Sequence, residues 1–299
     1  MIYSFLTSPA LKPFRSLTRA FARATIGVLT KECVVGGVRW SWIEAGPSDG
    51  EPLVLLHGFA GSKDNWLLVV PFLARRYRVI CPDLPGFGES GPTASGDYSI
   101  GEQADRVVRF IDALALGPCH LGGNSMGGYI ALAIALDAPD VVTSLLLLNN
   151  AGVDGPQLTP AQQALKAGHD LFDIRNTDDV DIVVSMLFHK PPYLPWLARQ
   201  AIVARQGRRR KLDRLILDQI LVDAVERPFN LRLDELTVPV LTVWGRGDNL
   251  LHVSAACAQH DAIARSQLVI LDDVGHVPMF EQPLRTARAM LSFLAGRRG

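Results

Sequence analysis

The sequence predicts an α/β domain in which crossover helices connect a mostly parallel sheet and a helical insertion interrupts the chain. Short apolar runs alternate with helical stretches over residues 32–152 and again over residues 236–299. Near-continuous apolar runs suit strands that are covered by helices on both faces. The 299 residues, 48% of them hydrophobic, suffice for one large domain with a buried core.

The first strands of the expected sheet form a hairpin over residues 33–44, which turns at Gly36 and Gly37. Six later apolar runs are expected to be strands: 53–56, 77–81, 119–122, 144–148, 240–244 and 267–271. Helical stretches lie between or after them, at 103–116, 129–137 and 283–294. This order indicates parallel strands that are joined by crossover helices.

The alternation stops over residues 153–235, which have helical periodicity and no convincing strand. We expect this segment to be a cap over the carboxyl ends of the strands, where open α/β sheets bind ligands. Phe188, Tyr193 and Trp196 are its candidate substrate-pocket residues, within an apolar group that also contains Phe172, Met186 and Leu187. The alternative is that such side chains form the core of the cap itself.

Residues 1–31 form a third, basic segment that contains no acidic residue. Its charges are Lys12, Arg15, Arg19, Arg23 and Lys31. Apolar side chains recur on another face, so the segment is either an interfacial helix on anionic lipid or a surface helix packed on the domain. Its apolar start precedes the charges, the reverse of a secretory signal, so we expect no cleavage.

The composition limits which partners and which structural sites we expect. Lys plus Arg and Asp plus Glu both number 30, so net charge gives no reason to expect nucleic acid. The four cysteines are far apart and form no C-x-x-C, which predicts neither a metal site nor a disulfide framework. A cytoplasmic protein is expected, with peripheral membrane contact through residues 1–31 left open.

Ser125 is the candidate nucleophile. It is the centre of GNSMG at residues 123–127, which follows the apolar run 119–122 and opens the helical stretch 129–137. A sharp turn from strand to helix needs flanking glycines and leaves the serine hydroxyl exposed. An ordinary glycine turn is the alternative, and the position between strand and helix favours the nucleophile.

A serine hydroxyl needs a base and a third group that orients the base. His276 and Asp248 each follow one of the last two expected strands, which places them at the same sheet edge as Ser125. The order serine, aspartate, histidine is that of the nucleophile-elbow fold. Asp272 and Asp273 are rival acids, but they lie too close to His276 in sequence to reach round its imidazole.

A second turn, HGFAG at residues 57–61, follows the strand 53–56. Acyl transfer needs two donors for the oxyanion, and backbone N–H groups provide them without reorganisation. The candidates are the N–H groups of Phe59 and Met126. By itself, HGFAG is compatible with a plain glycine turn, but its presence alongside Ser125 favours the oxyanion-hole interpretation.

The chain from residue 33 to residue 296 resembles the α/β-hydrolase superfamily. The motifs are HGF at 57–59, DLPGFGES at 83–90, GNSMGG at 123–128, WGRGD at 244–248 and GH at 275–276. The resemblance implies the α/β-hydrolase fold, with Ser125 as nucleophile, Asp248 as orienting acid, His276 as base and the amides of Phe59 and Met126 as oxyanion hole. The stretches 55–73 and 244–254 look like the monoacylglycerol-lipase and esterase branch.

A second branch cleaves carbon–carbon bonds of aromatic meta-cleavage products and shares GNSMGG and WGR. It usually has a glycine- and proline-rich first loop and a tryptophan after the final GH, whereas Ala60 and Val277 stand here. The expected function is therefore a serine carboxylic-ester hydrolase that acts on apolar acyl esters or lipids without a metal or cofactor. The alternatives are the carbon–carbon hydrolase and a non-catalytic binding protein, and the complete Ser125, Asp248 and His276 set disfavours the latter.

Overall fold

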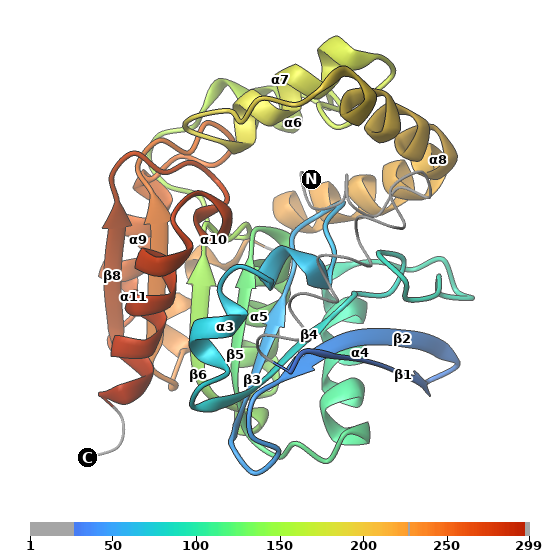
Figure 1. The fold of residues 1–299 in the computed structure, drawn as a ribbon. Helices are drawn as coiled ribbons and strands as arrows, with labels where there is room; N and C mark the ends of the chain where they lie inside the picture. The colour runs from blue at the N-terminus through green and yellow to red at the C-terminus, as the bar shows by residue number, and fades with distance from the viewer. Residues whose placement is uncertain (1–26, 227, 297–299) are drawn as a thin grey trace.

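The computed structural model describes residues 27–226 and 228–296. At its centre is an eight-stranded sheet in the order β1-β2-β4-β3-β5-β6-β7-β8 (Figure 1). The strands are β1 Leu29–Val35, β2 Val38–Ala45, β3 Glu51–Leu56, β4 Tyr77–Pro82, β5 Cys119–Asn124, β6 Val142–Leu148, β7 Val240–Gly245 and β8 Ser266–Leu271. β2 pairs antiparallel with β1 and β4, and the other neighbours are parallel, which confirms the predicted sheet.

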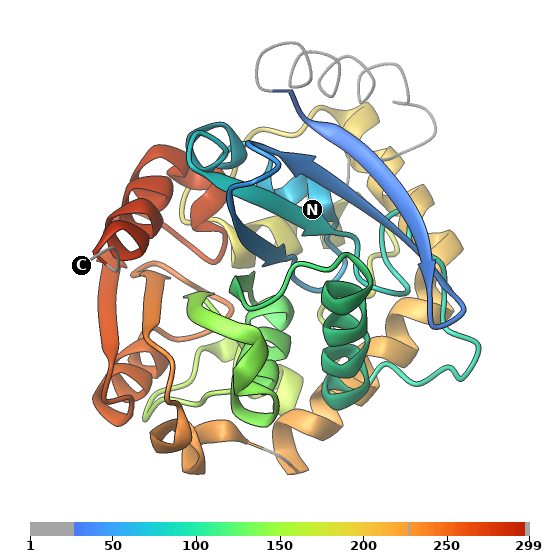
Figure 2. The same cartoon turned by 90° about the horizontal axis from the view of Figure 1, so that it is seen from below.

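Helices cover both faces of this sheet (Figures 1 and 2). The core helices are η2 Lys63–Trp66, α3 Val70–Leu73, α4 Ile100–Ala113, α5 Met126–Asp137, η3 Pro139–Val141, α9 Ser254–Ala262, α10 Pro278–Glu281 and α11 Pro283–Ala295. On one face, Val54 of β3 belongs to a buried cluster with residues of α4 and α5. On the other, Leu53 and Leu55 belong to a cluster with residues of α3 and α11. Successive residues of β3 therefore enter two different apolar layers, as the continuous apolar run requires.

The β1–β2 hairpin turns at Gly36 and Gly37, whose φ angles of 59° and 77° are the positive values that a tight hairpin demands. β1 begins at Leu29, earlier than expected, and Lys31 pairs with Glu44 of β2 at 2.9 Å. Residues 29–31 were expected in the basic N-terminal segment and instead pair as a strand with β2. The predicted helix, interfacial or packed on the domain, otherwise falls on residues 1–28, of which residues 27 and 28 form no helix and residues 1–26 lie outside the described residues.

The chain between β6 and β7 is helical throughout its described regular structure. It comprises α6 Pro160–Lys166, α7 Thr177–Leu187, α8 Trp196–Glu226, η4 Phe229–Leu231 and η5 Leu233–Glu235. In Figure 1, α6, α7 and α8 arch over the carboxyl ends of the strands. The predicted helical cap is therefore present, and its limits at residues 153 and 235 stay a prediction.

The long helix α8 is anchored on the core by polar contacts. Asp223 accepts a hydrogen bond from the N–H of Ile100 at 2.6 Å, and Arg209 donates to the carbonyl oxygen of Gly86 at 2.6 Å. Arginines of α8 also pair with acids, for example Arg209 with Asp213 of the same helix. Within the described residues, no helix has both the length and the apolar character of a membrane span.

Candidate active site

Ser125 occupies the junction between β5, which ends at Asn124, and α5, which begins at Met126. Its φ of 56° and ψ of −121° lie in a region that residues other than glycine rarely adopt. A Cβ on Gly123 would lie 2.2 Å from the carbonyl carbon of Gly127, which explains why the turn needs these glycines. The sequence prediction of a sharp strand-to-helix turn is therefore confirmed.

Two further loops reach this turn. A Cβ on Gly58 would lie 3.1 Å from the Cβ of Ser125, so the HGFAG turn packs directly against the serine. The side chain of Asn124 donates to the carbonyl oxygen of His276 at 3.0 Å, which joins the histidine loop to the residue before Ser125. Three segments far apart in sequence thus meet at the carboxyl edge of the sheet, as parallel strands allow.

His276 and Asp248 form a hydrogen-bonded pair in which Nδ1 of the imidazole donates to Oδ2 of the carboxylate at 2.8 Å. Both are buried, with only 2% of His276 and 5% of Asp248 exposed. The other carboxylate oxygen, Oδ1, accepts from the N–H groups of Leu250 and Leu251 at 2.8 and 2.9 Å. Because Oδ1 is held by the backbone and Oδ2 by the imidazole, the orientation of the ring is fixed through Nδ1.

Asn149, which follows β6, is a site residue that the sequence reasoning missed. Its Nδ2 donates to Oδ2 of Asp248 at 2.7 Å and to the carbonyl oxygen of Gly275 at 3.2 Å. Its φ of 42° is left-handed, a conformation that asparagine tolerates better than most residues. One signal was present in the sequence, since a polar residue directly follows an apolar strand at the edge where Asp248 and His276 were expected.

The two rival acids have other partners. Asp272 pairs with the guanidinium of Arg246 on the surface. An oxygen of Asp273 lies 3.4 Å from Nε2 of His189 in the cap. Among the described residues, Asp248 is thus the carboxylate that is hydrogen-bonded to His276.

His57 shapes the HGFAG turn from inside. Its Nδ1 donates to the carbonyl oxygen of Gly58 at 2.8 Å, and its Nε2 accepts from the N–H of Leu84 at 3.0 Å. Burial lowers the pKa of His57 to about 4, against the opposing effect of the Asp83 carboxylate. The imidazole is therefore neutral at neutral pH, and it connects the carbonyl group of Gly58, the residue before Phe59, to the N–H of Leu84.

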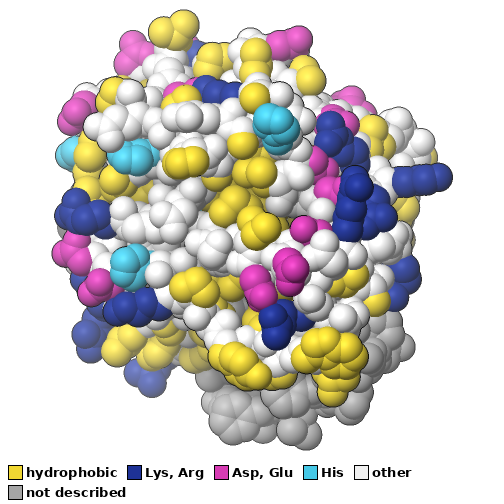
Figure 3. All heavy atoms as spheres, turned by 90° about the horizontal axis from the view of Figure 1, so that it is seen from above, with side chains coloured by type: hydrophobic (Ala, Val, Ile, Leu, Met, Phe, Trp, Pro, Cys, Tyr) yellow, Lys and Arg dark blue, Asp and Glu magenta, His cyan; other side chains and the backbone are white. Residues whose placement is uncertain are grey.

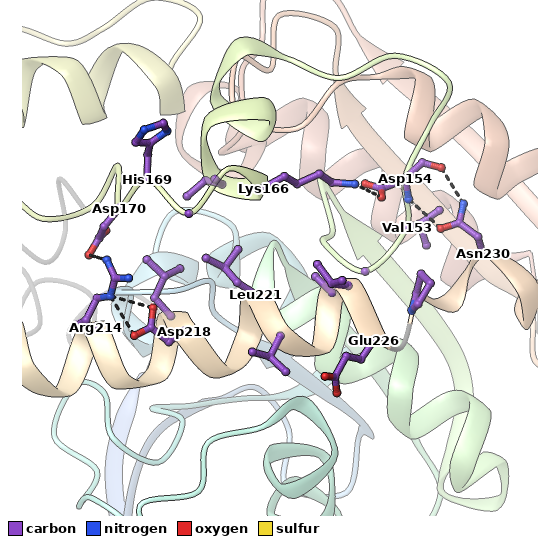
Figure 4. A pocket seen from close by; sticks show the side chains of 18 residues that line it. Val153, Asp154, Lys166, His169, Asp170, Arg214, Asp218, Leu221, Glu226 and Asn230 are labelled. Atoms are coloured by element: carbon purple, nitrogen blue, oxygen red, sulfur yellow. Dashed lines mark hydrogen bonds and ion pairs between the residues drawn. The ribbon is translucent and has the colours of Figure 1, made fainter.

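A cavity of about 130 Å³ opens beside Ser125 between the core and the cap. Its lining is mainly apolar and includes Phe59, Met126, Tyr129, Ala151, Val153, Leu165, Phe172, Leu217, Ile220, Leu221, Leu250 and Leu251. A larger cavity of about 500 Å³ adjoins it and shares Leu165, Leu217 and Leu221 with it (Figure 4). The apolar wall therefore continues from Ser125 into the outer cavity.

Among the described residues, five of the six charged side chains that line the outer cavity form ion pairs with one another, and the sixth is Glu226 of α8. Lys166 of α6 pairs with Asp154, and Arg214 of α8 pairs with Asp170 and Asp218 (Figure 4). These pairs leave the apolar side chains of α8, Leu221 among them, as the surface that an uncharged ligand would contact.

The three cap residues predicted for the substrate pocket do not line these cavities. Phe188 is 6% exposed and packs in the core, whereas Tyr193 and Trp196 are 86% and 60% exposed. Figure 3 looks down on the cap and shows apolar and charged side chains interspersed over this face. α7 ends at Leu187 and α8 begins at Trp196, so Tyr193 lies in the loop that connects them on the outer surface. Phe172 is the cap aromatic that reaches the cavity, where its ring contacts Phe59 edge to face.

Comparisons with known proteins place this geometry in a family. Residues 51–181 match the family model of the α/β hydrolase fold. Lipase 1 of Psychrobacter immobilis is 34% identical over 89% of this chain and 84% of its own length. This chain belongs to the α/β-hydrolase family. This α/β hydrolase is also 30% identical to human monoacylglycerol lipase ABHD6, over 83% of this chain and 77% of the relative.

A solved structure extends the similarity to the whole fold of this α/β hydrolase. The crystal structure of a membrane phospholipase A, described as a bacterial virulence factor, superposes with a TM-score of 0.89 at 31% identity. The match covers 99% of this chain and 94% of the other. The cap is therefore included in the similarity.

The neutral state of His57 predicts a pH dependence of folding stability. Because burial lowers its pKa from 6.5 to about 4, the unfolded chain binds a proton in this interval that the folded chain does not bind. The free energy of unfolding should fall as the pH is lowered from 6.5 towards 4, by up to about 3 kcal/mol from this group. Urea unfolding of the wild type and of His57→Asn at several pH values measures it. The variant should be less stable at pH 7 and should lack this part of the pH dependence, and identical slopes would contradict the prediction.

Proposed function

We propose that this α/β hydrolase is a serine carboxylic-ester hydrolase that acts on apolar acyl esters of the short- to medium-chain or monoacylglycerol type. The observation that carries the proposal is the buried Asp248–His276 pair, held next to the strained turn of Ser125 at an apolar cavity. The names of the relatives, a lipase and a monoacylglycerol lipase, support the same chemistry.

In the proposed mechanism, His276 accepts the proton of the Ser125 hydroxyl as its oxygen attacks the ester carbonyl carbon. The N–H groups of Phe59 and Met126 donate to the oxyanion that forms. Collapse of this intermediate breaks the ester bond, and the leaving alcohol takes the proton from His276. Water then gives a proton to His276 as its oxygen attacks the acyl carbonyl carbon. When this second intermediate collapses, the bond to the serine oxygen breaks, the acid leaves, and His276 returns the proton to Ser125. Asp248 orients the ring and stabilises its charged form, so the scheme invokes no metal or cofactor.

The carbon–carbon hydrolase alternative would use the same three side chains on a different substrate. Ala60 and Val277 depart from that branch, and the relatives named above are lipases. No observation favours this alternative. Turnover of a ring-fission dienoate without turnover of p-nitrophenyl esters would reverse the assignment.

Replacement of the nucleophile tests the proposal most directly. Ser125→Ala should lower kcat on p-nitrophenyl butyrate by about three orders of magnitude or more, because no acyl-enzyme can form. Ser185→Ala, which removes an exposed hydroxyl of α7, is the matched control and should retain wild-type kcat. Equal activity of Ser125→Ala and the wild type would refute the serine mechanism.

The two adjoining cavities predict how acyl-chain length is selected. A short acyl chain fits the cavity beside Ser125, whereas a longer chain must pass Leu221 into the outer cavity. Leu221→Trp should therefore lower the ratio of kcat/KM for dodecanoate to that for butyrate by about tenfold, the order that a few methylene contacts provide. Leu215→Trp is the control, since Leu215 lies on the same helix, is 41% exposed and lines neither cavity. An unchanged ratio in Leu221→Trp would place the acyl chain elsewhere.

We further propose that the basic segment 1–31 brings the enzyme to the cytoplasmic face of an anionic membrane. The support is the sequence pattern, since residues 1–26 lie outside the described residues. Each Lys or Arg near such a surface contributes about 1 kcal/mol. Replacement of Lys12, Arg15, Arg19 and Arg23 by glutamine should abolish binding of the protein to phosphatidylserine vesicles at low salt. Lys31 is left unchanged in this variant because it pairs with Glu44. Sedimentation of both proteins with vesicles measures this, and equal binding would refute the proposal.

A further inference from the structure

Glu281, at the end of α10, bonds two segments that belong to different parts of the molecule. Its Oε1 accepts from the N–H of Gly275 at 2.6 Å. Its Oε2 accepts from the N–H groups of His189 and Lys190 at 2.8 and 3.5 Å. Gly275 precedes His276, and residues 189 and 190 follow α7 of the cap. One carboxylate therefore links the histidine loop to the cap.

The same two segments also touch directly. The N–H of His276 donates to the carbonyl oxygen of Leu187 at 2.9 Å, across a distance of 89 residues in sequence. A Cβ on Gly275 would lie 2.6 Å from the backbone nitrogen of His189, so the two backbones are in contact. The end of α7 is thus part of the support of the histidine loop, and a shift of this part of the cap would move the loop with it.

A carboxylate is the side-chain group that suits this position. The histidine loop and the cap segment both present N–H donors to it, and an ionised carboxylate offers two acceptor oxygens and no donor. Glutamine offers one acceptor oxygen, and its NH₂ group would face an N–H group on the other side. An amide at position 281 must therefore leave one of the two segments without its bond.

We propose that Glu281 is a positioning residue that couples the cap to the base of the reaction. Its carboxylate holds the cap segment 187–190 on the histidine loop and so keeps the His276 imidazole aligned with Asp248 and Ser125. Glu281 acts through the backbone of Gly275 and takes no part in proton transfer. The inference rests on the proposed function, in which His276 is the base.

The test compares Glu281→Gln with Asp273→Asn in the full chain. Both variants change a carboxylate that contacts His189 into an amide, but Asp273 approaches only its side chain. Asn also tolerates the φ of 58° at position 273. For p-nitrophenyl butyrate, kcat per active site titrated with a small fluorophosphonate should fall about tenfold in Glu281→Gln, with KM within twofold, because a misaligned base slows the chemical step. Asp273→Asn should stay within twofold of the wild type in kcat.

A purely structural role would give a different result. If Glu281 only fastens the cap, Glu281→Gln should raise KM for long-chain esters and leave kcat for butyrate and the rate of phosphonylation unchanged. That outcome, or an equal loss of kcat in both variants, would overturn the proposal. If Glu281→Gln does not fold, Glu281→Asp, which keeps two acceptor oxygens at shorter reach, should lower kcat for butyrate relative to the wild type with KM within twofold, and a wild-type kcat in Glu281→Asp would overturn the proposal.

Hydrogen exchange separates this proposal from the ester-hydrolase assignment. Glu281→Gln should increase amide exchange in the segments around Gly275 and His189, and Asp273→Asn should not. If Ser125→Ala retained full activity, the proposed function would fail, whereas the link between the cap and the histidine loop would still stand on the exchange result. Unchanged exchange in Glu281→Gln would overturn the link itself.

Discussion

The arrangement of this site depends on the need to satisfy one buried carboxylate. Asp248 is buried in the loop after β7, at the carboxyl edge of the sheet. Its carboxylate accepts four hydrogen bonds, two from the backbone of Leu250 and Leu251 and two from the side chains of Asn149 and His276. A buried charge without partners would cost several kcal/mol, so these donors must stay in place. These donors come from the loops after β6, β7 and β8. The Asp248 carboxylate therefore fixes the positions of three loops relative to one another.

The need of buried polar groups for partners also organises the HGFAG turn at residues 57–61, which packs against Ser125. Lys63 is buried and forms ion pairs with Asp83 and Glu89, and Asp83 also accepts from the N–H of Glu89. The neutral His57 forms hydrogen bonds with Gly58, the residue before Phe59, and with Leu84, the residue after Asp83. It thereby connects this network to the HGFAG turn. Polar side chains at the sheet edge thus form hydrogen bonds with backbone groups of the loops. These bonds give the loops the rigidity that the proposed N–H donors of Phe59 and Met126 require.

The cap both lines the apolar cavities and contacts the histidine loop. Its helix α8 supplies apolar side chains that line the cavity beside Ser125 and the outer cavity, while most of the charged residues at the outer cavity form ion pairs with one another. The end of α7 lies on the backbone of the histidine loop, and Glu281 bonds both. The apolar cavity beside Ser125 and the support of the histidine loop therefore depend on the same insertion.

The sequence by itself determined the order of strands and helices, the turn at Ser125 and the expectation that Asp248 and His276 meet at one edge. These depend on local signals, namely apolar runs, flanking glycines and the position of a polar residue directly after a strand. The tertiary structure decided that, of the apolar cap residues which the sequence offered, Phe172 lines the cavity while Tyr193 and Trp196 face solvent, and it added Leu221. This choice depends on helix rotation and loop paths that periodicity does not resolve. The tertiary structure also brought Asn149 to Asp248, 99 residues away, and joined Glu281 to His189 of the cap, 92 residues away, in addition to its near neighbour Gly275. No local pattern encodes which distant group a side chain will meet.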